Sequence, residues 1–255
     1  MRLLATVSYD GTRYAGYQVQ PEQMTIQSTI EKALAQIHKG DVIKIVASGR
    51  TDAGVHAIGQ TFHFDSNLTI PIPKWKAALN ALLPNDILIK DVVQVADDFH
   101  ARYDVNQKRY RYKIWNDQDA NPFQRYYCHH VDQPLDLEAI NRACQFVKGE
   151  HDFTSFCAAN SNTKGSKVRK VFDAACERDG HYVIFTFTGN GFLYNMVRIL
   201  VGTLIEVGLG QMPPEQLKRI LASHDRTKAG KTAPAQGLYL DKVIYRSVTG
   251  SKTPT

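Results

Sequence analysis

The sequence has few of the features that mark redox, zinc and membrane proteins. Its four cysteines stand well apart and form no Cys-x-x-Cys pair, which argues against a zinc ribbon and a redox dithiol. No apolar run approaches the ~20 residues of a membrane-spanning helix. The N-terminal segment reaches Asp10 too early for the core of a signal peptide. We therefore expect a soluble, cytoplasmic protein with reduced thiols.

Nucleotide-binding and metal-binding motifs are missing as well. The chain has no P-loop and no dinucleotide-binding glycine fingerprint. Its nine histidines are scattered, and with the cysteines they show no ligand spacing. The sequence therefore predicts neither a metal site nor a cofactor.

The composition is that of a folded, basic protein. With 255 residues, 43% of them hydrophobic, the chain can bury one large core or two smaller ones. A formal net charge of +6 fits a polyanionic partner, although many basic proteins bind no nucleic acid.

The hydrophobic pattern predicts an α+β fold in two halves of similar size. The first half has strands at 3–9, 43–46, 61–64 and 87–95 and helices at 26–37 and 73–83, with Ser28 and Glu31 as a capping box. The second has strands at 108–115, 168–188 (a pair) and 238–245 and helices at 137–147, 193–207 and 214–222. We divide the chain into domains 1–104 and 105–247 and a flexible tail, 248–255.

A turn-rich segment, 48–57, places Asp52 among glycines and small residues between two predicted strands. A backbone of this kind can approach a ligand closely, which makes Asp52 a candidate site residue. The alternative is a turn in which the Asp52 side chain merely bonds its own backbone.

Arg198 is the second candidate, because it is the only charged Asp, Glu, Lys or Arg between Asp179 and Glu206. It lies on a predicted helix that is apolar nearly all round, so a carboxylate or phosphate should lie against its guanidinium. A structural ion pair with any acidic residue would satisfy the same requirement.

The strand at 108–113 alternates, so that Tyr110 and Tyr112 face one side and the basic residues face the other. Aromatic rings that stack on bases and cations that neutralise phosphates suit RNA. Core tyrosines under a solvated basic face would give the same pattern.

The segment Gly49–Ala57 resembles the catalytic signature of TruA-type tRNA pseudouridine synthases. Further segments match that family in the same order, at 8–12, 14–18, 99–102, 109–112, 152–156, 196–202 and 233–240. The resemblance covers nearly the whole chain and favours the functional interpretation of Asp52, Arg198 and Tyr110.

The resemblance implies a role for each site residue. Asp52 would drive cleavage of the N-glycosidic bond as nucleophile or base, and Arg198 would favour its charged form. Tyr110 would pack on the uracil, with Tyr112 supporting it from the core. Arg50 would help to extrude the nucleotide from its stem, and Leu193 would line the base pocket.

The resemblance also implies an architecture and partners. Family members have two RRM-like (ferredoxin-like) halves whose sheets join across a central basic cleft, and they act as homodimers without a cofactor. The expected substrate is the tRNA anticodon stem-loop, at positions 38, 39 and 40. Two alternatives remain, a non-catalytic RNA-binding module and a related synthase with another RNA target.

Overall fold

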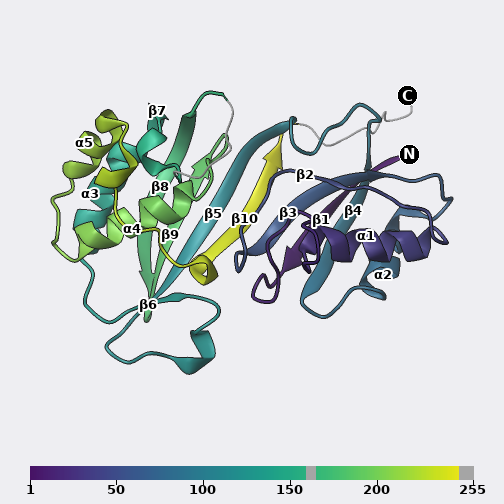
Figure 1. Ribbon diagram of the computed structural model, residues 1–255, viewed down its shortest axis with the longest axis horizontal. Coiled ribbons are helices and arrows are strands. Elements are labelled where there is room, and N and C mark those ends of the chain that lie inside the picture. Colours follow the sequence, from purple (N-terminus) through teal and green to yellow (C-terminus); the bar gives the residue numbers. More distant parts are fainter. Residues whose placement is uncertain (159–164, 247–255) are drawn as a thin grey trace, which may run out of the picture. The chain divides into compact units, whose positions relative to one another are not determined.

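The computed structural model describes residues 1–158 and 165–246, which form two compact units (Figure 1). Unit 1 consists of Met1–Asn106 together with the chain from Leu240 to Arg246, and unit 2 is the described part of Gln107–Tyr239. The predicted tail, 248–255, lies outside the described residues.

Unit 1 is built on a sheet with the strand order of a ferredoxin-like fold. Its strands are β1 (Arg2–Tyr9), β2 (Val46–Ala47), β3 (His56–Asp65) and β4 (Ile87–Val95). β1 pairs antiparallel with both β3 and β4, and β2 pairs antiparallel with β3, which gives the order β4-β1-β3-β2. Strand β10 (Leu238–Tyr245) is also a neighbour of β3. Helices α1 (Ile26–Ile37) and α2 (Ile72–Asn80) complete the unit, and α1 runs across the strands in Figure 1.

Helix α1 begins with a different cap from the one that the sequence predicts. Thr25 is the N-cap residue, and it exchanges hydrogen bonds with Ser28 in a capping box. The predicted pair of Ser28 and Glu31 is therefore wrong. Glu31 instead accepts hydrogen bonds from Lys44 and from the Ile45 backbone N–H, at 3.1 and 3.2 Å. This contact takes the place of strand pairing just before β2, which is shorter than predicted.

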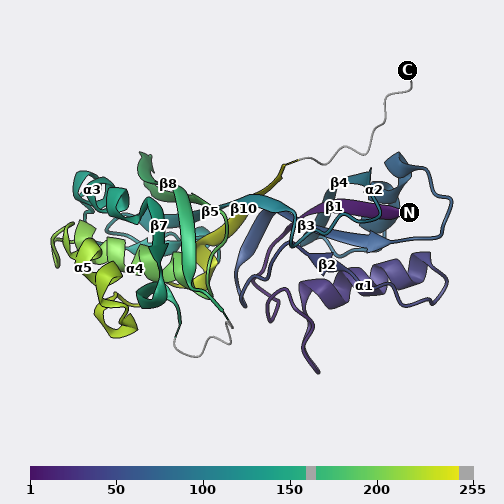
Figure 2. The same ribbon diagram turned by 90° about the horizontal axis from the view of Figure 1, so that it is seen from above.

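Unit 2, like unit 1, has helices in the connections between its antiparallel strands. Its strands are β5 (Val105–Asn116), β6 (His129–Val131), β7 (Gly149–Asp152), β8 (Val168–Asp179) and β9 (Tyr182–Gly189). β9 lies between β5 and β8, β7 pairs with β8, and β6 runs parallel to β5. Helices α3 (Leu137–Val147), α4 (Met196–Gly208) and α5 (Gln216–Ser223) lie together in both views (Figures 1 and 2).

Each unit buries its own apolar side chains. In unit 1, the fully buried Trp75 of α2 packs edge-on against Phe64 of β3, with ring centroids 5.4 Å apart. In unit 2, Phe185 and Phe187 stack along β9, at 6.5 Å. These cores and strand orders confirm the predicted α+β fold.

All four cysteines are buried and free of disulfides, and no described helix is long and apolar enough to cross a membrane. Within 1–158 and 165–246, no group of three or more His, Cys, Asp or Glu side chains could hold a metal ion.

Candidate active site

Asp52 lies in the loop that joins β2 to β3 in unit 1, where its side chain is partly exposed and Arg50 is exposed. The loop closes in a turn in which the Val55 N–H donates to the Asp52 carbonyl oxygen, at 3.1 Å. Gly54 adopts a φ of +75°, a conformation that favours glycine. Main-chain atoms form this hydrogen bond, so it makes no demand on the Asp52 carboxylate.

The base of the loop is held by a buried amide. Gln60 of β3 is fully buried, and its Oε1 accepts from the Ser48 hydroxyl and from the Thr61 N–H. Its Nε2 donates to the Gly49 carbonyl, at 3.0 Å. Both ends of this side chain are therefore used, and two of its bonds hold the residues just before Arg50.

Thr51, the residue before Asp52, is fixed from the side chain and from the backbone. Its hydroxyl bonds with the Tyr9 hydroxyl at 2.8 Å, and its carbonyl accepts from the Tyr17 N–H at 3.0 Å. The Tyr17 ring lies 6.2 Å from that of Tyr9, and burial raises the pKa of its phenol well above the ordinary value. Tyr9 thus holds the side chain of the residue beside Asp52, and Tyr17 holds its backbone.

Two glycines allow the segment 11–16 to touch this loop. A Cβ on Gly11 would overlap the Val55 carbonyl oxygen, and one on Gly16 would lie 2.9 Å from the Thr51 carbonyl oxygen. Gly16 also has a φ of +99°. Only glycine fits this close approach of two backbones.

His56 ends the loop at the start of β3. Its Nδ1 accepts from the Gly11 N–H at 3.1 Å and lies 3.2 Å from Asp10 Oδ1, and the ring is 2% exposed. The loop is therefore fastened before and after Asp52 by buried polar contacts.

In unit 2, strand β5 alternates as predicted. Tyr110, Tyr112 and Ile114 are buried, whereas Arg109, Arg111 and Lys113 are partly exposed. Tyr112 is fully buried and its hydroxyl donates to the Pro234 carbonyl at 2.8 Å. Burial raises the pKa of this phenol. Tyr112 is thus a core residue, whereas the Tyr110 ring packs edge-on against Phe192, at 5.2 Å.

Arg198 lies on the first turn of α4 and is partly buried. Its Nε donates to the Ala233 carbonyl at 2.7 Å and its Nη1 donates to Asn195 Oδ1 at 3.0 Å. The Ala233 N–H in turn donates to the Arg198 carbonyl, at 3.1 Å. These contacts fix the direction of the guanidinium with neutral partners.

Leu193 lies in a turn before α4 rather than in the helix, which begins three residues later than predicted. Asn195, at the N-cap, has a left-handed backbone with a φ of +60°, which separates the turn from the helix. The Leu193 side chain is buried. Core packing and a place beside the uracil would both bury it, so the role beside the uracil stays a prediction.

The structure thus places Arg50 and Asp52 on one loop of unit 1 and Tyr110, Leu193 and Arg198 in unit 2. Sequence reasoning did not identify Gln60. One signal could have found it, because an amide inside a strand with many buried residues needs buried partners. Tyr9, Gly11 and Gly16 fall in segments that carry the family resemblance, but their contacts with the loop depend on tertiary structure.

Comparison with known proteins agrees with the resemblance. A family model described as tRNA pseudouridine synthase matches residues 5–104 and 143–246. A protein of Oceanobacillus iheyensis named tRNA pseudouridine synthase A is 53% identical over 244 residues, 96% of each chain. Proteins of the same name from Anoxybacillus flavithermus and Bacillus licheniformis are 49% and 50% identical, each over 96% of this chain and 98% and 99% of their own. The chain therefore belongs to the tRNA pseudouridine synthase family, a family of isomerases.

Proposed function

We propose that this isomerase converts uridine to pseudouridine at positions 38, 39 and 40 of the tRNA anticodon stem-loop, with Asp52 as the catalytic carboxylate. The observation that supports this role most strongly is the fastening of the loop. Hydrogen bonds to Gly49, Thr51 and His56 hold the loop on both sides of Asp52, while the Asp52 side chain stays partly exposed. Such preorganisation is what a catalytic group requires.

The proposed reaction breaks the bond between N1 of uracil and C1′ of ribose and forms a bond between C5 and C1′. The proton on C5 is lost and N1 gains one, so the product is an isomer of the substrate. Asp52 drives the first step, either by attack on the sugar or by promoting a glycal-like intermediate. Neither route needs a cofactor.

We assign the remaining site residues to substrate binding. Arg50 is exposed beside Asp52 and helps to keep the target nucleotide out of its stem. Tyr110 packs on the uracil and takes part in the proton transfer, and Leu193 lines the base pocket. Arg198, with its direction fixed by Ala233 and Asn195, favours the charged form of Asp52.

We further propose that the enzyme acts in the cytoplasm as a homodimer and binds the anticodon stem-loop in a basic cleft. The division into domains 1–104 and 105–247 likewise stays a prediction. Sedimentation of the purified chain tests the dimer. Limited proteolysis tests the domain boundary near residue 104.

Mapping pseudouridines in RNA from cells that lack this protein tests the function. The proposal predicts loss of pseudouridine at tRNA positions 38–40, restored by the wild-type chain. Loss at sites in another RNA would favour a related synthase with a different target. If no pseudouridine is lost and the purified protein forms none in any tRNA, a non-catalytic RNA-binding role would replace the proposal.

A further inference from the structure

The turn between β4 and β5 presents an exposed aromatic ring in unit 1. Tyr103 is 75% exposed, the second most exposed large hydrophobic side chain among the described residues. Its ring is nevertheless held in place, because it stacks on His100 with centroids 4.2 Å apart and an interplanar angle of 28°. The ring is therefore both exposed to a partner and held in one orientation.

His100 is fixed by the backbone of the same turn. Its Nδ1 lies within hydrogen-bond distance of the N–H groups of Arg102 and Tyr103, at 3.2 and 3.3 Å. Its own N–H donates to Asp104 Oδ2 at 2.7 Å, and its carbonyl accepts from the N–H groups of Tyr103 and Asp104. The ring beneath Tyr103 is therefore preorganised.

The turn is also anchored to the core of unit 1. The Ala101 N–H donates to Nδ1 of the buried His63, at 3.0 Å, and the Ala101 carbonyl accepts from the Tyr245 hydroxyl at 2.8 Å. Phe99 packs against the Tyr245 ring, with centroids 5.1 Å apart. His63 also contacts His100 edge-on, at 5.1 Å. Tyr103 thus stands at the outer end of a chain of rings that begins in the core.

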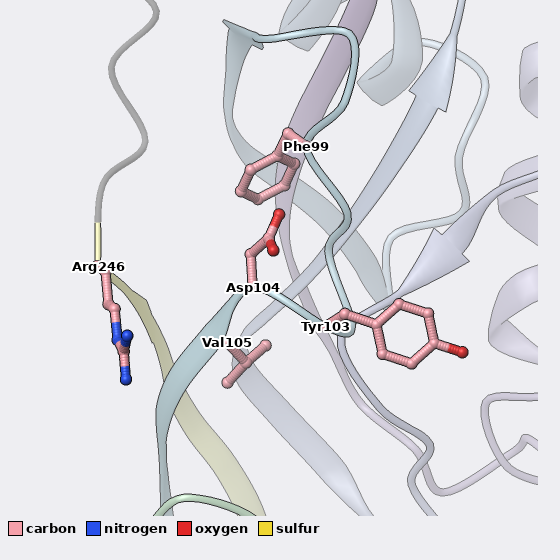
Figure 3. A pocket seen from close by; sticks show the side chains of 5 residues that line it. All are labelled: Phe99, Tyr103, Asp104, Val105 and Arg246. Carbon is pink, nitrogen blue, oxygen red and sulfur yellow. The ribbon is translucent and has the colours of Figure 1, made fainter.

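Charge and shape around Tyr103 fit RNA. The Arg102 guanidinium carbon lies 5.9 Å from the centre of the Tyr103 ring. A hollow of about 410 Å³ lies beside the ring, and Phe99, Asp104, Val105 and Arg246 complete its lining (Figure 3). Figure 3 shows Tyr103 and Arg246 on opposite sides of Asp104. Asp104 is bonded to the His100 N–H.

We propose that Tyr103, supported by His100, is a stacking site for an unpaired base of the RNA substrate, and that Arg102 contacts an adjacent phosphate. Base stacking on an aromatic side chain contributes ~1 to 3 kcal/mol, and a fixed ring loses little entropy on binding. The inference rests on the proposed function, because it assumes an RNA substrate. It adds a contact outside the Asp52 loop.

Full-length Tyr103→Ala and Tyr103→Phe variants test the stacking, with tRNA affinity measured at several salt concentrations. Alanine should weaken binding about tenfold, whereas phenylalanine, which keeps the ring, should stay within about twofold of wild type. The slope of log K against log salt should not change in either variant. Arg102→Ala should make that slope shallower, by about the contribution of one phosphate contact. Thermal unfolding should be unchanged, because Tyr103 is exposed.

Wild-type affinity in the alanine variant would overturn the inference while leaving the proposed function intact. So would a loss of affinity that phenylalanine does not restore. If the alanine variant bound tRNA normally but no longer self-associated as its concentration rises, the ring would instead contact a second protein copy. Failure of the wild-type protein to form pseudouridine would count against the proposed function and not against RNA stacking, which is measured by binding alone.

Discussion

Replacing Gln60 by leucine should show that the loop carrying Asp52 depends on a buried amide. The change removes three hydrogen bonds, to Ser48, Gly49 and Thr61. Each contributes about 0.5–1.5 kcal/mol, and buried groups left without a partner cost more. We therefore expect a loss of about 3 kcal/mol in the free energy of unfolding. At roughly 2–4 °C per kcal/mol, Tm should fall by about 6–12 °C.

The same variant should lose activity beyond what its lower stability explains. The Gln60 amide holds the residues just before Arg50, so its loss lets the Asp52 backbone shift. Small misplacements of a catalytic group can cost about 100-fold in rate. Well below Tm, we expect kcat for pseudouridine formation to fall by at least about tenfold, with tRNA affinity near that of wild type.

Asn80→Leu is the matched control in the same unit. The Asn80 side chain makes two hydrogen bonds to the Ile89 backbone, at 2.8 and 2.9 Å, and joins α2 to β4. Its loss should lower Tm while leaving kcat near wild type. If Gln60→Leu and Asn80→Leu had the same kcat, or if Gln60→Leu left Tm unchanged, the reasoning about the loop would be refuted.

Three further perturbations address other parts of the molecule. Gly202→Ala should destabilise the protein by at least about 1–3 kcal/mol in urea unfolding, because a Cβ there overlaps the Lys231 carbonyl oxygen; an unchanged midpoint would contradict this packing. Burial lowers the pKa of His63 from 6.5 to about 4, so the unfolded state binds the proton first. Stability should therefore fall between pH 6.5 and 4, by at most about 3 kcal/mol, and His63→Gln should flatten this profile. Arg198→Lys should reduce kcat more than tenfold, because lysine lacks the guanidinium fork that bonds Ala233 and Asn195. A near-normal kcat would contradict the proposed role of Arg198.

Much of the fold follows from local patterns in the sequence. The strands at 87–95 and 238–245 and the helix at 137–147 have the predicted bounds, because each is long enough for its apolar residues to mark it in the sequence. Short elements have no such period. The three residues of β6 form a strand only because they pair with Ile114, Trp115 and Asn116 of β5. Likewise, the sequence could not show that Glu31 accepts hydrogen bonds from Lys44 and Ile45 as well as from Gln27 of its own helix, rather than capping the start of the helix.

The candidate site, like the fold, can be predicted from the sequence only in part. The proposed catalytic segment can be recognised from consecutive residues, because the family resemblance rests on their order around Asp52. Its supports come from distant positions, such as Tyr9 on β1 and Gln60 on β3. A hydrogen bond between residues 42 positions apart, such as that of Tyr9 with Thr51, depends on the tertiary structure. Resemblance can mark such residues as shared with a family, but only the fold explains their role.

The most direct test of the account is single-turnover pseudouridine formation by the Asp52→Asn variant on a tRNA anticodon stem-loop. The amide keeps the size of the side chain and removes its negative charge. We predict no detectable pseudouridine, with tRNA affinity and Tm close to those of wild type. Pseudouridine formation at the wild-type rate by this variant would contradict the assignment of the catalytic carboxylate.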